Sequence, residues 1–551
     1  MKKLVIVVAL CLTAVVAFGQ ARPTLAILPF TGGSGGEGET LAELFSFDQT
    51  LNGAFTPIPR TSINAAIQKE QSFQMSSGMT DPETISRIGK QLGARYIVAG
   101  SITRLGDQQL IVIAIMQIEN LQQIAGEWLT YQNISEVRGK LPEMAKNIVA
   151  ASRNNTSKLQ KLAVLPFQIS SGDREADALA QILAAEIIRT GAYAVFPRTK
   201  TLEQIQAEYN TQTSGITDDY NIASIGRGDN PLLALSGAAR RLGQDRMFNA
   251  AIINVESGVQ VKGNSVEYQV IEEGPQTIQI LAGLLTGVMN ISVSNLHWLL
   301  KAVDAINKAG EGNFTITLTG DITVSPNDQN ISFTNNGWKT ITILGDNSER
   351  SLTCQQKEFL LIIPSGINMI LGRNLKLSSS LWAGVKVEYG GTLRMESGAT
   401  IANCNGTGVS VGGTFTMNGG IIRGNKSSGV VVGSKSIFTM NGGTISDNSE
   451  KGNGGGVYVA TGGTFTMNDG EISYNTVMAF SKESGGYGGG VYVKKNGTFV
   501  KTGGFFMHNK AEKGGDAVYG ENSNGKAFRN NYQITHSNMD SRVTGKAGGW
   551  E

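Results

Sequence analysis

The stretch Gly413-Thr-Phe-Thr-Met-Asn-Gly-Gly420 returns twice, with little change, further along the chain. Its copies are Ser436-Ile-Phe-Thr-Met-Asn-Gly-Gly443 and Gly463-Thr-Phe-Thr-Met-Asn-Asp-Gly470. A weaker copy precedes the three at 391–398, and a degraded one follows at 497–504. A unit of this length buries little surface by itself, so its copies must stack on one another. The sequence therefore predicts a solenoid in the last part of the chain.

The spacing of the copies predicts how this solenoid is wound. Spacings down the Phe column are 23, 27 and 34 residues, and roughly 22 residues suffice for three short strands with their turns. The surplus enters at 449–454 and at 476–489, always before a Val-x-Val strand. Because the insertions are confined to one corner, we expect a regular coil with loops along one edge. Four inward-facing columns carry the pattern: Phe415, Phe438, Phe465 and Phe499; Met417, Met440 and Met467; Ile401, Ile422, Ile445, Ile472 and Phe506; Val409, Val430, Val457 and Val491.

These units resemble the right-handed parallel β-helix of the pectate-lyase-like superfamily, and also the repeats of polymorphic membrane proteins and spirochaete surface proteins. The resemblance implies an all-β solenoid over 294–535, followed by a polar tail at 536–551. A helix over 296–309, with Ser294 as its N-cap, is expected to cover the open first rung, which would otherwise recruit another strand. The uncharged stretch 277–300 is long enough for a membrane span, but its Gly, Asn and Ser residues favour two soluble helices.

No catalytic, cofactor-binding or metal-binding residue can be assigned to the solenoid. Enzymes of this fold need clustered carboxylates, whereas the acids Asp447, Asp469, Asp516 and Asp540 share no column. A calcium-binding nonapeptide is excluded because Gly490 stands where that motif requires an acid. Asn425, Asn448, Asn475 and Asn509 form a further column, which we interpret as a buried amide ladder. Cys404 belongs to the same column, and whether it pairs with Cys354 remains open.

The first half of the chain contains an internal duplication. Leu-Ala-Ile-Leu-Pro-Phe at 25–30 returns as Leu-Ala-Val-Leu-Pro-Phe at 162–167, an offset of 137 residues. Each copy alternates β-type runs with helical patterns, which indicates α/β or α+β modules at 22–152 and 159–290. The second copy passes from Leu242-Gly243 almost directly to 250–255. We therefore expect it to have lost part of its hairpin and gained a Gly/Asp-rich loop near 226–230.

This tandem pair resembles the exported module shared by CsgG-like channel proteins, the amino-terminal domain of TolB-like proteins and lipoprotein activators of penicillin-binding proteins. The residues that carry the resemblance are the Leu-Pro-Phe strand, the Pro-Arg pair at 59–60, and the run Ile88-Gly-Lys-Gln-Leu-Gly-Ala-Arg-Tyr-Ile-Val-Ala-Gly-Ser-Ile-Thr-Arg104. It implies a non-enzymatic envelope module for protein interaction. The channel members' membrane hairpins have no counterpart here, which argues against a pore.

One motif in the first copy could be mistaken for a nucleotide site. Gly33-Ser-Gly-Gly-Glu-Gly38 fits G-x-G-x-x-G between a strand and a helix. The second strand, however, ends in Pro59-Arg60 without the expected ribose-binding acid, and the second copy has Ser170-Ser-Gly-Asp-Arg174 at this turn. We interpret the motif as a flexible loop.

The first 19 residues predict export. Met1-Lys-Lys followed by an uncharged run to Phe18 is typical of a signal peptide, and Cys11 follows Leu10 rather than the small residue of a lipoprotein site. Removing Lys2 and Lys3 leaves 45 basic against 45 acidic residues, which gives no support for nucleic-acid binding. Beyond the leader, the mature chain is expected to have no stable transmembrane segment.

These features predict an exported, non-enzymatic binding or adhesion scaffold in the periplasm or at the outer membrane or cell surface. Its expected partner is a protein or glycan of the envelope or host surface, bound by the insertions at 449–454 and 476–489 and by the exposed strand faces. The first alternative is a periplasmic factor for envelope assembly or cell-wall synthesis that acts through the tandem modules. The second is a carbohydrate-active β-helix enzyme, which the scattered acids disfavour.

Overall fold

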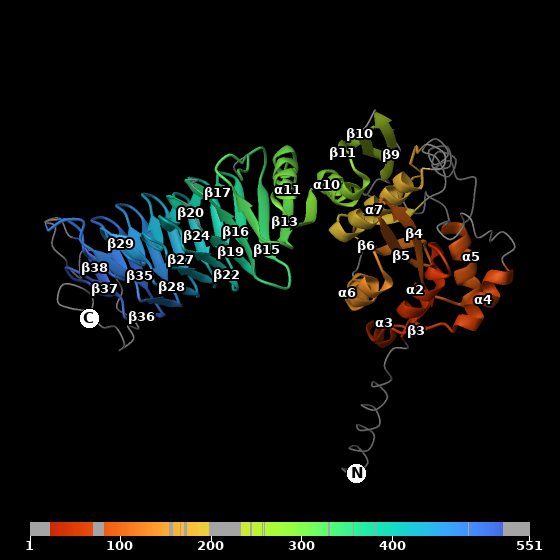
Figure 1. Ribbon diagram of the computed structural model, residues 1–551, viewed down its shortest axis with the longest axis horizontal. Coiled ribbons are helices and arrows are strands. Elements are labelled where there is room, and N and C mark those ends of the chain that lie inside the picture. The colour runs from red at the N-terminus through yellow and green to blue at the C-terminus, as the bar shows by residue number, and fades with distance from the viewer. Residues whose placement is uncertain are drawn as a thin grey trace, which may run out of the picture. The chain divides into compact units, whose positions relative to one another are not determined.

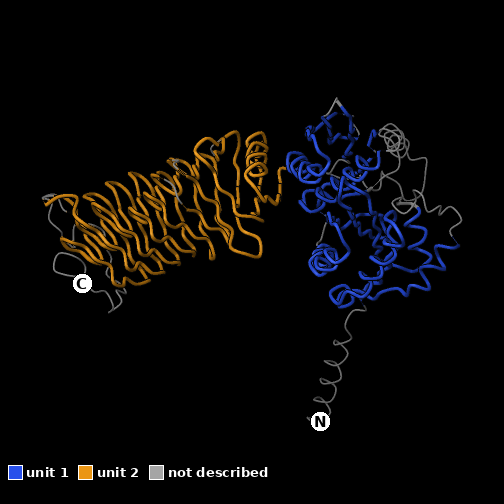
Figure 2. The backbone as a smooth tube through the Cα atoms, in the orientation of Figure 1, with its two compact units in different colours: residues 1–286 blue, residues 287–551 orange. Residues whose placement is uncertain are grey.

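A computed structural model of the 551-residue chain has two compact units, residues 1–286 and 287–551 (Figure 2). It describes residues 22–521 apart from 70–81, 154–157, 166, 170–172, 198–232, 243–244, 256, 258, 329–330, 356–357, 379–380 and 483. The predicted leader, the polar tail and the loop near 226–230 lie outside the described residues. Within these ranges, no helix is long and apolar enough to cross a membrane.

The first repeat of unit 1 is a mixed sheet with helices on both faces (Figure 1). Strand β1 pairs in parallel with β3 and β4, and β4, β5 and β6 form an antiparallel meander. One hydrophobic core gathers α2, α3 and α6, while a second gathers α4 and α5. The elements are β1 (Thr24–Ile27), β2 (Thr31–Gly32), α2 (Glu37–Ser46), α3 (Gln49–Ala54), β3 (Thr56–Pro57), α4 (Arg60–Lys69), α5 (Pro82–Leu92), β4 (Tyr96–Leu105), β5 (Gln108–Gln117), β6 (Gln122–Tyr131) and α6 (Ile134–Ser152).

The second repeat follows the same plan at the same offset. Its elements are β7 (Gln160–Val164), α7 (Arg174–Thr190), β8 (Tyr193–Pro197), β9 (Leu233–Leu242), β10 (Asp245–Asn254), β11 (Gln260–Tyr268), η1 (Ile271–Glu273) and α10 (Gly274–Thr286). Strands β9 and β10 have ten residues each, as do β4 and β5. The expectation of a shortened hairpin was therefore wrong. The first hairpin strand ends at Leu242, whereas the expectation considered only the short stretch between Leu242-Gly243 and 250–255.

The two repeats share one eleven-stranded sheet, because β6 of the first pairs with β8 of the second. Their strand-to-strand contact is slight, with Gln123 opposite Val195. Helix α7 supplies the larger contact by lying across β6. Gly126 makes this approach feasible, since a Cβ there would stand 2.6 Å from the Cα of Ala185. The junction is thus a helix packed on a strand, with a minor strand pair beside it.

The outer strands of this sheet differ in what they expose. Strand β11 is the counterpart of β6, but its residues 260–265 are all exposed, whereas residues 122–127 of β6 are all buried. The other outer strand, β3, has two residues and includes Pro57, which lacks an N–H. By register, Pro57 stands where β8 has Val195, the residue that pairs with β6. Strand β3 of the first repeat therefore cannot pair at this position as β8 of the second repeat pairs with β6.

Unit 2 is a parallel β-helix (Figure 1). Three long sheets run along it, with nine, eight and seven strands, and a short fourth sheet has three. The nine-stranded sheet contains β12 (Val288–Val293), β13 (Gly312–Leu318), β15 (Lys339–Gly345), β18 (Ile367–Leu371), β21 (Thr392–Met395), β24 (Thr414–Met417), β27 (Ile437–Met440), β31 (Thr464–Met467) and β35 (Thr498–Lys501). The eight-stranded sheet contains β14 (Ile322–Val324), β16 (Arg350–Cys354), β19 (Leu375–Ser378), β22 (Ala399–Ala402), β25 (Ile421–Arg423), β28 (Thr444–Ser446), β32 (Glu471–Ser473) and β36 (Phe505–Met507). The seven-stranded sheet contains β17 (Phe359–Ile363), β20 (Ala383–Val387), β23 (Thr407–Val411), β26 (Val430–Val432), β30 (Val457–Val459), β34 (Val491–Val493) and β38 (Val518–Gly520).

The first rung is covered by helix α11 (Leu296–Lys308), as expected from the sequence. The helix packs on β12, β13 and β14. Its N-cap is Asn295, which accepts a hydrogen bond from the Trp298 N–H at 3.1 Å, so the assignment of Ser294 was wrong by one residue. Strand β12 continues to Val293, so the helix begins later, and Asn295 takes the extended backbone that an N-cap requires.

Identical side chains stack in register inside the β-helix of unit 2, hereafter called the rod. Phe415, Phe438, Phe465 and Phe499 are fully buried, and successive ring centroids lie 4.7, 4.6 and 4.9 Å apart. Each ring belongs to the same position of a neighbouring strand, so the separation is the strand spacing itself. Cys354 and Cys404 are both buried free thiols.

Two amide ladders run along the rod. In the buried ladder, the amides of Asn425, Asn448 and Asn475 each donate to the Oδ1 of the next rung, ending at Asn509, with distances of 2.8, 2.9 and 2.9 Å. The motif's own Asn residues form a second, exposed ladder: Asn468 donates to Asn441 at 2.8 Å and Asn441 to Asn418 at 3.0 Å. The sequence predicted the first ladder, and the second is an addition.

The glycine column before each Val-x-Val strand makes room for the buried ladder. A Cβ at Gly429 would lie 2.8 Å from the side-chain nitrogen of Asn448, and one at Gly456 would lie 3.0 Å from that of Asn475. Gly490 has the same relation to Asn509, at 3.2 Å. The glycine that stands where a calcium motif would carry its acid is therefore a packing requirement of the Asn ladder.

The two ladders give a matched test of this construction. Asn448→Ala would leave the N–H and amide of Asn425 without their acceptor in the core, and each unsatisfied buried group costs about 1–3 kcal/mol. We expect native-state hydrogen exchange of β25, β28 and β32 to report a loss of local stability of about 3 kcal/mol. In the exposed ladder, Asn441→Ala should change it by less than about 0.5 kcal/mol. Equal effects of the two substitutions would contradict the assignment.

Candidate functional site

The insertions at 449–454 and 476–489 are more regular than the expected loops. They begin with β29 (Ser449–Lys451) and β33 (Thr476–Met478), which pair in parallel with each other, and β33 pairs in turn with β37 (Lys510–Ala511). The last rungs of the rod thus have a fourth side. Val477 faces inward and is buried, which explains why the added side folds onto the rod. A stack formed by Tyr458, Tyr492 and Tyr519 lies on the neighbouring sheet, with ring centroids 5.3 and 5.6 Å apart.

Large apolar side chains are exposed on the second insertion and just before it. Phe480 is 78% exposed, Tyr474 51% and Met478 44%. Phe480 follows β33 in a short loop that is closed by an antiparallel bridge between Ala479 and Gly485. The N–H of Ala479 donates to the Glu512 carboxylate at 2.7 Å, which ties this loop to the next rung. The fourth sheet therefore presents apolar groups from an anchored segment.

Four acids of these last rungs accept hydrogen bonds from within the rod. Asp469 accepts from the Gly470 N–H, Asp516 from the Ala511 N–H and Asp447 from the Ser446 hydroxyl, at 2.8, 2.8 and 2.7 Å. Glu450 accepts the Ser428 N–H at 3.0 Å. These carboxylates lie at different corners and are already hydrogen-bonded, which is unlike a paired acid and base.

The glycine-rich loop of the first repeat holds its own anion. Gly33, Gly35 and Gly36 have positive φ, and α2 begins directly after them. The Glu37 carboxylate accepts the Ser34 N–H at 3.4 Å and the Tyr131 hydroxyl at 2.8 Å. A carboxylate therefore occupies the helix N-terminus, the place where a phosphate would bind in a dinucleotide site.

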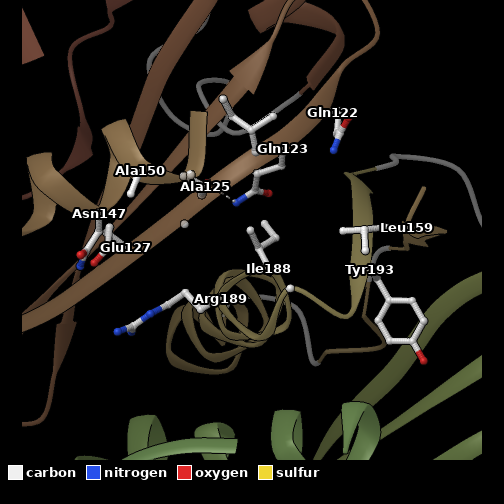
Figure 3. Close-up of a pocket in the computed structure, with 14 residues that line it drawn as sticks. Gln122, Gln123, Ala125, Glu127, Asn147, Ala150, Leu159, Ile188, Arg189 and Tyr193 are labelled. Atoms are coloured by element: carbon white, nitrogen blue, oxygen red, sulfur yellow. Dashed lines mark hydrogen bonds between the residues drawn. The ribbon is translucent and has the colours of Figure 1, made fainter. Parts of the chain in front are cut away.

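A cleft of about 530 Å³ lies between the two repeats of unit 1, over strand β6 (Figure 3). Residues 122–127 of β6 line it, together with parts of α6 and α7. At one end Glu127, Asn147 and Arg189 come together, whereas Leu159 and Tyr193 lie at the other (Figure 3). Ala150 and Ile188 contribute apolar wall between them. The cleft thus has ionisable groups at one end and a mixture of polar and apolar wall along its length.

Burial dominates the electrostatics of Glu127. Its side chain is 7% exposed, and this burial raises its pKa to about 7 despite the opposing effect of Arg189 and a hydrogen bond from Asn147. Arg189 binds another acid, since its Nη1 lies 2.9 Å from the Oε1 of Glu186. Glu186 also accepts hydrogen bonds from Trp128 Nε1 at 2.5 Å and from Gln279 Nε2 at 3.4 Å. The arginine is therefore engaged by Glu186, and Glu127 is left with a neutral partner.

The sequence predicts no site residue in unit 1, and this cleft is not among its predictions. A signal was present, because Glu127 interrupts the apolar run Ile124-Ala-Gly-Glu-Trp-Leu129. Its counterpart in the second repeat is Asn264, at the same offset of 137. The sequence alone could not show that the second repeat would bury the first repeat's last strand.

Comparison with known proteins supports both the β-helix of unit 2 and the α/β repeats of unit 1. A family model described as a right-handed beta helix region matches residues 362–535. The Tol-Pal system proteins TolB of Pseudomonas syringae pv. syringae and of pv. tomato are each 32% identical to this chain over 135 residues. The match covers 24% of this chain and 27% of each relative, so the chain spans about a quarter of the length of these curated relatives.

Three solved structures are similar to parts of the chain. TolB from Acinetobacter baumannii has a TM-score of 0.17 and 18% identity over 24% of this chain and 29% of its own. The LpoB C-terminal domain from Salmonella enterica has a TM-score of 0.17 and 16% identity, over 22% of this chain and 91% of its own. A chain of the PelC dodecamer from Paraburkholderia phytofirmans has a TM-score of 0.15 and 15% identity, over 22% of this chain and 83% of its own. At TM-scores this low, nothing about this chain is inferred from the three structures.

The raised pKa of Glu127 makes unit 1 sensitive to pH. Between the ordinary value of 4.5 and about 7 the folded state keeps a proton that the unfolded state loses, so stability falls as pH rises through this window. At about 1.4 kcal/mol per pKa unit, the loss amounts to about 3 kcal/mol. We expect hydrogen exchange of β6 and α7, corrected for intrinsic rates, to be faster at pH 8 than at pH 5.

Two variants test this assignment. Glu127→Gln has no proton to lose and should remove most of the pH dependence, whereas Glu143→Gln should keep it, because the Glu143 side chain is 62% exposed. If both variants retained the full pH dependence, another group would be responsible.

Proposed function

We propose that this chain is an exported, envelope-associated protein that binds its partner without catalysis, through the fourth sheet of its β-helix. The observation that carries the proposal is the use of the last rungs' side chains. Phe, Met and Asn of the motif build the rod, and the acids cap its turns, while Tyr474, Met478 and Phe480 are exposed. Exposed aromatic and Met side chains are typical of contact surfaces.

Envelope association rests on the first half of the chain. The relatives that it matches belong, by name, to the Tol-Pal system, and the predicted leader of residues 1–19 agrees with export. The partner class that fits an apolar, aromatic surface is a protein or a glycan, since aromatic side chains supply large contact areas to both.

A second candidate function is a periplasmic assembly factor in which unit 1 binds the partner. The exposed strand β11 favours it, because the corresponding strand of the first repeat is covered by α7. Protease treatment of intact cells separates the two: a surface protein would be cut within the rod, whereas a periplasmic factor would be spared.

The contribution of the fourth sheet can be measured with a double substitution. Met478→Ser with Phe480→Ser should weaken binding by at least tenfold, because hot-spot side chains each contribute about 2 kcal/mol or more. The full chain would be tested against immobilised matrix proteins, mammalian glycans and peptidoglycan. Ile437→Ser, at a 47% exposed side chain of the nine-stranded sheet, is the matched control.

Two results would count against this function. One is that the full chain binds nothing on these surfaces, and the other is that the double variant binds as the unaltered chain does. An unchanged far-UV circular dichroism spectrum would show that the rod remains folded in the variant.

A further inference from the structure

The cleft between the repeats combines features that few surface grooves share. It is about 530 Å³ in volume, within the range of small-molecule sites. Three side chains that line it are polar and more than nine-tenths buried, namely Gln122, Gln123 and Glu127. Polar groups this deeply buried are normally satisfied by protein partners. Here two of them retain hydrogen-bonding capacity toward the cleft.

Gln123 is one of these groups. Its Nε2 donates to the Ala125 carbonyl at 3.3 Å, which leaves Oε1 as an acceptor. The amide lies near the middle of the cleft, between the two ends (Figure 3). A donor that enters the cleft would therefore meet an acceptor there.

Glu127 is the other group. No lysine, arginine or histidine in the described part of the chain forms a salt bridge with its carboxylate, and its hydrogen-bond partner is the neutral Asn147. The ionisable groups that act on it are Arg189 and Glu186 from α7 and Glu143 from α6. Arg189 is paired with Glu186 and Glu143 with Lys140, so Glu127 is the carboxyl group at this end that has no cation of its own among the described residues. A buried acid without its own counterion is costly when ionised.

We propose that this cleft is a binding site for a small organic cation, a primary amine or guanidinium carried on an apolar stem. The cationic head pairs with the Glu127 carboxylate beside Asn147. The stem lies along Ala125, Ala150 and Ile188, and a second donor on the ligand reaches Gln123 Oε1. Each part of the ligand thus meets a group of matching chemistry, and the head supplies the charge that the site lacks.

Ionisation of Glu127 links this binding to pH. Because its pKa is about 7, the carboxyl group must lose a proton before it pairs with a cation. Affinity should therefore rise with pH and level off above about 8. At pH 6 it should be about tenfold below the plateau, since each pH unit below the pKa lowers the ionised fraction about tenfold.

The test is calorimetric titration of the full chain with agmatine and with cadaverine, at pH 6 and pH 8. We expect saturable binding at pH 8 and about tenfold weaker binding at pH 6. Valeramide, which has a similar stem without the charge, should not bind. Glu127→Gln should abolish binding, whereas Glu43→Gln, at an exposed acid of α2 that does not line the cleft, should leave it unchanged.

Two additions keep the result decisive. Ala150→Phe would fill the wall while leaving the acid in place, and it should also abolish binding. A short acetylated peptide with one central arginine distinguishes the source of the cation: if it binds more tightly than agmatine, the head group belongs to a partner protein's side chain. Absence of saturable binding by both amines and the peptide, or equal binding by Glu127→Gln, would overturn the proposal. Neither outcome bears on the fourth sheet of the rod.

Discussion

In-register stacking between successive rungs is the constraint on which the rod depends. Phe438 lies between Phe415 and Phe465, and Asn448 between Asn425 and Asn475, so each side chain is both supported and supporting. A shift of one residue along a strand would turn each of its side chains to the opposite face. Extra residues can therefore enter only between strands, where they do not alter the register. The insertions at 449–454 and 476–489 obey this rule.

The same stacking also determines where the rod requires glycine. Gly456 and Gly490 would be ordinary turn residues were it not for the amides beside them, which leave no space for a Cβ. The exposed positions of each rung are free of this demand. In the last rungs, Tyr474, Met478 and Phe480 use this freedom, since they are exposed on β33 and beside it.

Unit 1 uses repetition differently, because its two copies are fused rather than stacked. The last strand of the first copy is covered by α7 of the second, and the joint creates a cleft that neither copy has by itself. Glu127 owes its burial to this joint, since Asn264, its counterpart at the same offset, is exposed. The same position of the module is therefore buried in the first repeat and exposed in the second, and burial in the first raises the pKa of Glu127.

Sequence patterns predicted the architecture well where it is periodic. The Phe, Met, Ile and Val columns, the buried Asn ladder and the helix over the first rung all follow from spacing, since period and register leave few alternatives. The hairpin of the second repeat was mistaken because its first strand ends at Leu242, whereas the pattern considered was the short stretch after Leu242-Gly243. The fourth sheet was taken for loops because strands of two or three residues have no detectable period. The cleft could not be predicted, because it depends on how two modules meet.

The two amide ladders run in opposite directions. In the buried ladder each amide donates toward the carboxy-terminal end of the rod, whereas in the exposed ladder each donates toward the amino-terminal end. Aligned amides add their dipoles along an axis, as peptide groups do in a helix. Here the two rows oppose one another, so their contributions to an axial dipole largely cancel. A rod of this kind can grow by whole rungs without accumulating a macrodipole from its ladders.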